Sequence, residues 1–173
     1  MKALYGGGKM TIRTTILAAA LLGLAAIAAA DDFETIPDDI LGVWETAHDD
    51  VNWSRIEITR ENDRYYGRIV HLNSPVYPED GVDGPPGRPR MDLNNPDETL
   101  RQRPAMGLEI MRDFRHDPGD GKWKDGRIYD PKSGNEYRCK LTLKDADTLE
   151  VFGYKKVGFV KLGRNTTWTR HHE

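Results

Sequence analysis

The sequence predicts an all-β protein, a small antiparallel up-and-down β-barrel with one short helix in a long loop. After residue 40 the chain reads as roughly eight short alternating segments separated by turn residues, with little helical periodicity. Its two ends also match, because Gly42-Val43-Trp44 opens the first segment and Trp168-Thr169-Arg170 closes the last. A closed barrel brings its first and last strands together, and an arginine packs well on a tryptophan face. We therefore expect Trp44 to be buried near Arg170 or Arg164, as structural residues of the seam.

Residues 1–30 have the layout of a secretory signal peptide. A basic start precedes an apolar stretch at 16–29, and Ala28-Ala29-Ala30 then supplies small residues for cleavage. The 14-residue stretch is shorter than the roughly 20 residues of a spanning helix. We predict cleavage after Ala30, with Met10 as an alternative start. The protein would be periplasmic or secreted, with no stable membrane insertion after cleavage.

The remaining 143 residues suffice for one domain, divided into a lead-in at 31–40 and a barrel at 41–173. Cleavage would remove three basic and no acidic residues, leaving 22 against 28 and a net charge of −6. A mildly acidic domain with mixed signs is not typical of nucleic-acid binding, so no nucleic-acid partner is expected. Cys139 is the only cysteine, so packing alone must stabilise the fold.

The predicted strands follow from alternation and from the turns between them. The first, at 41–47, carries Trp44, and in the second Ile56 and Ile58 share one face and polar residues the other. The clearest is 136–143, where Tyr137, Cys139, Leu141 and Leu143 face one way. Turn residues rich in Asp, Gly and Pro separate the later strands. The predicted strands are 41–47, 55–59, 65–72, 106–114, 123–129, 136–143, 148–154 and 164–170.

One long loop, 73–104, interrupts this rhythm and holds seven of the ten prolines. A loop of this length in a compact domain is functional or disordered. Asn95 has the character of a helix N-cap, with Pro96 at the first helical position and Pro104 as a stop. We expect one or two helical turns across a barrel mouth, preceded by an extended segment at 75–89.

An ordered set of short motifs over residues 40–170 resembles the bacterial family known as domain of unknown function 2147. The motifs are Gly42-x-Trp44, Tyr66-Gly67-Arg68-Ile69-Val70, Asp92-x-x-Asn95-Pro96-Asp97, Gly107-Leu108-x-Ile110, Gly126-x-Ile128-Tyr129-Asp130-Pro131, Ser133-Gly134-x-x-Tyr137-x-Cys139-x-Leu141, Gly153-Tyr154, Leu162-Gly163-Arg164 and Trp168-x-Arg170. The resemblance implies an exported barrel similar to the lipocalin and calycin group. It implies no reaction, so it assigns no catalytic residue.

Residue patterns for catalysis and metal binding are weak. The five histidines lack a spacing that would direct two of them to one ion, so no metal is expected. Cys139 alternates with apolar residues, which favours a buried and unreactive thiol over a nucleophile. The carboxylate pairs lie in hydrophilic stretches, where solvated surface explains them. We expect no cofactor and assign no catalytic residue.

The barrel mouth is the best candidate for a site, with the 92–104 segment as its lid or rim. Arg101 and Arg103 would attract a carboxylate or phosphate head group, and an apolar tail would lie beside Tyr137, Leu141 and Trp168. The alternative is that the short helix only closes the end of the barrel.

Three functions stay open on the sequence alone. The first is a periplasmic binding module for a small apolar or amphipathic ligand. The second is an envelope interaction or structural-support protein with a filled barrel, whose partner is another envelope protein. The third is a hydrolase or isomerase that uses loop carboxylates. A cavity of a few hundred cubic ångströms would favour the first over the second.

Overall fold

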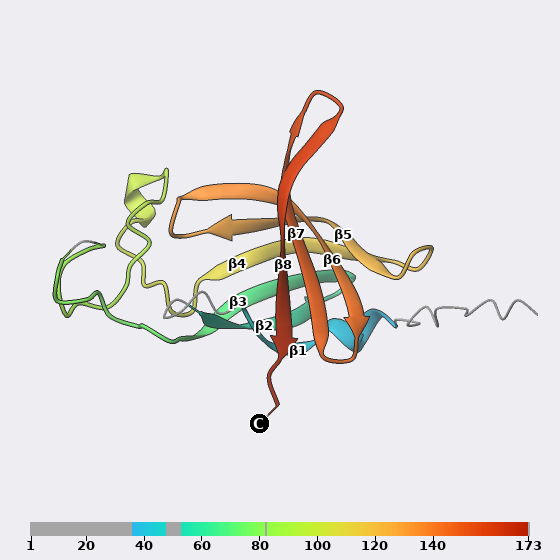
Figure 1. Ribbon diagram of the computed structural model, residues 1–173, viewed down its shortest axis with the longest axis horizontal. Coiled ribbons are helices and arrows are strands. Elements are labelled where there is room, and N and C mark those ends of the chain that lie inside the picture. The colour runs from blue at the N-terminus through green and yellow to red at the C-terminus, as the bar shows by residue number, and fades with distance from the viewer. Residues whose placement is uncertain (1–35, 48–52, 82, 173) are drawn as a thin grey trace, which may run out of the picture. The chain divides into compact units, whose positions relative to one another are not determined.

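Eight antiparallel strands form one closed barrel in the computed structural model (Figure 1), which describes residues 36–47, 53–81 and 83–172. Each strand pairs with its neighbour in sequence, and β1 closes on β8. The fold is therefore the predicted up-and-down barrel. The strands are β1 (Gly42–Glu45), β2 (Ser54–Glu61), β3 (Arg64–Leu72), β4 (Glu109–Asp117), β5 (Lys122–Asp130), β6 (Asn135–Asp145), β7 (Thr148–Val157) and β8 (Val160–Arg170).

The seam between β1 and β8 is short, and side chains reinforce it. Among the described residues, Trp44 stands opposite Arg170 and Glu45 opposite Thr169 in the register. The Arg170 guanidinium donates hydrogen bonds to the carbonyl oxygens of Leu41 (2.8 Å), Asp39 (2.6 Å) and Ala146 (2.7 Å). Of the two arginines expected here, Arg170 is the one that packs on Trp44. Arg164 lies further along β8.

The segment before the first strand contributes to the core, which the sequence did not indicate. A 3₁₀ helix, η1 (Pro37–Ile40), leads into β1 and buries Ile40 completely. The indole nitrogen of Trp44 donates to the carbonyl oxygen of Ile40 at 2.9 Å. This bond satisfies the one polar group of a fully buried tryptophan.

The end of the barrel away from the long loop is filled with large side chains. The core is continuous and includes Trp44, Ile56, Phe114, Trp123, Leu141 and Leu149, all fully buried. Tyr65 packs edge-on against Trp123, with ring centroids 6.1 Å apart. Large side chains of this kind each contribute about 1.5–3 kcal/mol when removed from water. The barrel is therefore solid at this end.

The long loop between β3 and β4 is folded rather than simply extended. Val76 and Pro89 form an antiparallel bridge, and Met91 bridges Pro104, so the expectation of an extended segment at 75–89 is wrong. Its helix is a single 3₁₀ turn, η2 (Glu98–Leu100), shorter than one or two α-helical turns. Asp97, and not Asn95, caps it by accepting from the backbone N–H of Thr99.

The last hairpin is longer than predicted. β7 runs three residues past Tyr154, and β8 begins at Val160 instead of Arg164. Residues 155–162 pair only with each other, since β6 stops pairing with β7 at Arg138 and Tyr154. Figure 1 shows this tip extending past the neighbouring strands.

The predicted signal peptide, residues 1–30, lies outside the described residues. Within the described part of the chain, no helix has the length and hydropathy needed to cross a bilayer.

Candidate functional site

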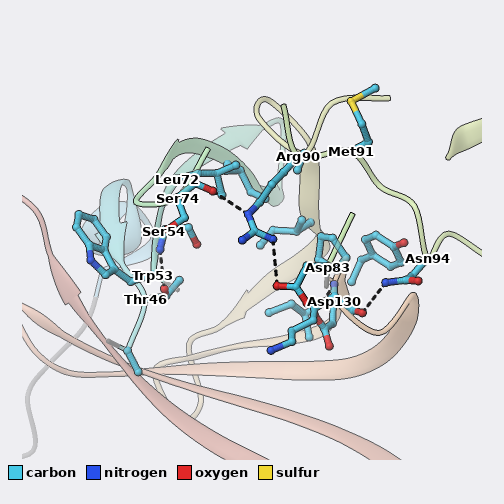
Figure 2. Close-up of a pocket in the computed structure, with 18 of the residues that line it drawn as sticks. Thr46, Trp53, Ser54, Leu72, Ser74, Asp83, Arg90, Met91, Asn94 and Asp130 are labelled. Atoms are coloured by element: carbon cyan, nitrogen blue, oxygen red, sulfur yellow. Dashed lines mark hydrogen bonds and ion pairs between the residues drawn. The ribbon is translucent and has the colours of Figure 1, made fainter. Parts of the chain in front are cut away.

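A cavity of about 530 Å³ occupies the end of the barrel under the long loop (Figure 2). Along β5 the inward-facing positions pass from Trp123 in the core to Ile128 at the cavity. The apolar part of its wall is Ile69, Leu72, Tyr77, Ala105, Ile110, Ile128 and Trp168. Its polar and charged part includes Ser74, Asp83, Arg90, Asp130, Lys132 and Arg164. The volume lies within the range of small-molecule sites, roughly 300–1,000 Å³.

The first half of the loop forms one wall through Tyr77. This side chain is buried, and its hydroxyl donates to the carbonyl oxygen of Met91 (3.2 Å) and accepts from the Met91 N–H (2.9 Å). Arg90 lies over the Tyr77 ring, with its guanidinium carbon 5.3 Å from the ring centroid. Figure 2 shows Arg90 joined to the carbonyl oxygen of Ser74 and to Asp83. The wall is thereby held by both backbone and side-chain bonds.

The second half of the loop is anchored by a buried carboxylate, Asp92. Its Oδ1 accepts from the Tyr129 hydroxyl at 2.6 Å, and its Oδ2 accepts from Asn95 Nδ2 at 2.7 Å and Arg103 Nε at 2.9 Å. Asp92 is fully buried, and Arg103 is the cation that balances it. Burial, followed by the bond to Asp92, raises the pKa of Tyr129 to about 12. Tyr129 therefore stays a protonated donor at neutral pH.

A second anchor joins the loop to the turn between β5 and β6. Asn94 Nδ2 donates to the carbonyl oxygen of Lys132 at 2.8 Å. Gly134 has φ +68°, and a Cβ placed there would lie 1.8 Å from the Asn94 carbonyl oxygen. Only glycine permits this close approach. The loop is thus built to dock on this turn.

The site residues expected from sequence divide between cavity, core and loop anchor. Trp168 lines the cavity, whereas Leu141 is fully buried in the solid core. The Tyr137 ring instead lies under Lys155, whose Nζ is 4.9 Å from the ring centroid. Arg103 binds Asp92, and Arg101 donates to the Asn95 carbonyl oxygen at 2.8 Å and pairs with Glu98. Neither arginine is among the cavity-lining residues, and both bind partners within the long loop.

The cations that line the cavity are Arg90, Lys132 and Arg164. The sequence did signal one of them, because Arg164 shares its strand face with Thr166 and Trp168 by alternation. Arg90 and Lys132 come from the long loop and from a turn. Their positions depend on how the loop and the turn fold, which the alternation of apolar and polar residues does not predict.

The geometry distinguishes the carboxylates that the sequence left open for catalysis. Asp92 does not line the cavity and has both oxygens occupied by donors, which suits an anchor better than a general acid or base, whereas Asp83 and Asp130 do line it. Burial raises the pKa of the Cys139 thiol to about 12, so it stays protonated. Within residues 36–47, 53–81 and 83–172, no three His, Cys, Asp or Glu side chains group around a common point.

Comparisons with known proteins agree with the architecture. The bacterial family described as "Uncharacterized protein conserved in bacteria (DUF2147)" matches residues 42–170. A solved structure from the human pathogen Helicobacter pylori, described as belonging to the lipocalin family, superposes with a TM-score of 0.60 at 24% sequence identity. The superposition covers 77% of this chain and 83% of that one. At this identity the likeness shows the fold alone. No curated protein matches the sequence significantly.

Proposed function

Since this chain belongs to the bacterial DUF2147 family, for which no activity is described, we propose from its geometry that it binds a small amphipathic molecule. The observation that carries the proposal is the cavity of about 530 Å³ at the end of an otherwise solid barrel. An open pocket of this volume with an apolar wall and a few charged groups has the size and the lining of a small-molecule site.

The lining indicates which end of the ligand goes where. Ile69, Ile110 and Trp168 are buried and form an apolar interior. Three cations, from Arg90, Lys132 and Arg164, line the wall along with two carboxylates, from Asp83 and Asp130. Asp83 pairs with Arg90, and Asp130 accepts from Ser133 and from the Lys132 N–H. Counted together, three cations and two carboxylates give the lining a net charge of +1, which favours an anionic head group, such as a carboxylate or phosphate, over a cationic one.

One line of sequence evidence supports a place outside the cytoplasm, the predicted signal peptide, which would export the chain. We propose a periplasmic or secreted binding module. The alternatives are an envelope interaction or support protein, for which the solid part of the barrel would suffice, and a hydrolase or isomerase, in which Asp83 or Asp130 at the cavity would act as acid or base.

A titration with saturated fatty acids and with an isoprenoid phosphate tests binding, because Trp53 and Trp168 line the cavity and report on it by fluorescence. We expect saturable quenching or enhancement in the wild type. Thr166→Phe should abolish it by filling the cavity, and Arg164→Ala should weaken anionic ligands selectively.

Two control variants change residues of the same types, a threonine and an arginine, at positions outside the cavity. Thr167→Phe changes the next residue, which is exposed and faces away from the cavity, and Arg127→Ala removes an exposed arginine from β5. Both should bind like the wild type. Absence of saturable binding in the wild type, or equal loss in Thr166→Phe and Thr167→Phe, would refute the proposal.

A further inference from the structure

The tip of the β7–β8 hairpin is the largest exposed apolar feature in the described part of the chain. Val157, Val160 and Leu162 are 58–59% exposed, and Phe159 at the turn is fully exposed. The turn itself is tight, with Gly158 at φ +61°, so Phe159 is presented at the end of the ribbon. Exposed clusters of this kind mark interaction surfaces.

The tip stands free of the barrel wall. Pairing of β7 with β6 ends at Tyr154, and beyond it Lys155, Lys156 and Val157 pair only with β8. Two-stranded ribbons are of marginal stability in water. Figure 1 shows this ribbon as the outermost extension of β7 and β8. Its apolar residues therefore stabilise no described part of the barrel core.

Basic residues surround the apolar tip. Lys155, Lys156 and Lys161 lie within the free tip, and no Asp or Glu occurs from 151 to 172. Over 31–173 the formal charge is −6, and 155–162 carries +3, so the rest of that stretch carries −9. This asymmetry would orient the protein with its hairpin towards an anionic surface. The lysine stems can lie along the apolar tip while their ammonium groups remain in water.

We propose that the β7–β8 tip docks peripherally on an anionic phospholipid surface, with Phe159 and its apolar neighbours in the headgroup and acyl boundary and the lysines on lipid phosphates. Aromatic and apolar residues flanked by lysines are the composition of interfacial membrane contacts. The contact spans no bilayer, so it agrees with the absence of stable insertion expected after cleavage. It also holds whether or not the cavity binds a ligand.

A second protein fits this surface less well. Stable protein interfaces bury about 800 Å² on each partner, more than a narrow two-stranded tip offers. A second copy of this chain would bring the same lysines together, and like charges repel. An anionic bilayer instead satisfies both the apolar residues and the cations.

Vesicle sedimentation tests the proposal with residues 31–173, which hold the whole described barrel and exclude the apolar stretch at 16–29. We expect binding to vesicles of phosphatidylcholine and phosphatidylglycerol, weak binding to phosphatidylcholine alone, and release by added salt. Lys156→Gln/Lys161→Gln should lower partitioning about 25-fold, at about fivefold for each lysine. Phe159→Ser should lower it about tenfold or more.

Controls use exposed residues elsewhere on the barrel. Val70→Ser/Met106→Ser removes two exposed apolar side chains, and Lys122→Gln/Lys144→Gln removes two lysines. Both variants should partition like the wild type, and all should keep its thermal midpoint. A fluorophore on Phe159→Cys reports insertion directly, because Cys139 is buried and unreactive. Its emission should shift to the blue with anionic vesicles.

Three results would overturn the proposal. They are equal partitioning of the wild type and the tip variants, equal binding to neutral and anionic vesicles, and an unchanged fluorophore spectrum. Self-association without lipid that Phe159→Ser abolishes would also overturn it, by assigning the tip to an interface between copies. None of these results bears on ligand titration of the lipid-free protein, so the two proposals fail separately.

Discussion

The guanidinium carbon of Arg170 lies 4.2 Å from the centroid of the Trp44 ring. The two residues also stand opposite each other in the β1–β8 register. The arginine thus covers the face of a fully buried tryptophan and donates to three carbonyl groups, from η1, from Leu41 just before β1 and from the β6–β7 turn. Closure of the barrel depends on this contact because the β1–β8 ladder is so short.

Trp44→Ala should destabilise the protein by about 3–5 kcal/mol, as expected for truncating a buried tryptophan. Arg170→Ala should cost several times the 0.5–1.5 kcal/mol of one hydrogen bond, because three carbonyl groups lose a donor. Urea unfolding monitored by fluorescence and circular dichroism measures both. Arg127→Ala, an exposed arginine, should change the unfolding free energy by about 0–1 kcal/mol. If Trp44→Ala unfolds with the same free energy as the wild type, the seam does not have this role.

Asp92→Asn should release the second half of the long loop. The change leaves Arg103 without its carboxylate partner and replaces one of the two acceptor oxygens of this anchor by an NH2 donor. Breaking a buried pair costs about 3–5 kcal/mol, and the partial exposure of Arg103 places this case near the lower end. Trypsin should then cleave after Arg101 much faster than in the wild type, whereas the bond after Arg103 precedes Pro104 and resists trypsin. Glu79→Gln, an exposed carboxylate in the same loop, serves as control and should not accelerate cleavage.

Tyr129 should ionise later than an ordinary tyrosine, with a pKa of about 12. Its raised pKa means that the folded state retains the proton while the unfolded state loses it at about pH 10. The stability contributed by Tyr129 is therefore complete below pH 10 and is lost as the pH rises to about 12. Tyr129→Phe should remove this part of the alkaline decline. Ultraviolet difference titration checks the assignment, and an unchanged high-pH titration in Tyr129→Phe would refute it.

Gly134→Ala should disrupt the docking of the loop on the β5–β6 turn. The residue has a positive φ, and an added Cβ would collide with the Asn94 backbone. Strained backbone of this kind costs about 1–3 kcal/mol before the collision is counted. Gly119→Ala is the matched control, since its Cβ would meet only the Asp117 side chain at 3.1 Å. Thermal unfolding separates the two, and equal midpoints would contradict the docking role.

Cys139 should resist thiol reagents in the folded protein. It is 1% exposed, and burial raises its pKa to about 12, so little thiolate is available at pH 8. Reaction with a disulfide reagent should begin only as urea unfolds the protein. Rapid reaction under native conditions would show that β6 opens locally.

Much of the barrel could be read from the sequence. Alternation placed all eight strands, because a half-buried strand must repeat with a period of two. The matching ends brought Trp44 to a seam, since neighbouring strands in an up-and-down barrel follow chain order and the last must meet the first. These inferences depend on local pattern, and local pattern is what sequence records.

The tertiary structure decided where the loop and the hairpin charges lie. Asp92 accepts a hydrogen bond from Tyr129, 37 residues away in the sequence. Arg103 pairs with the same carboxylate, so it anchors the loop, whereas the sequence had suggested a ligand contact. The side chains of Leu141 and Ile128 are both apolar and both point into the barrel, yet Leu141 fills the core and Ile128 lines the cavity. Depth along a barrel, and the partner a charged side chain selects, depend on long-range packing. Periodicity tells which face a residue occupies but not how far along the barrel axis it lies.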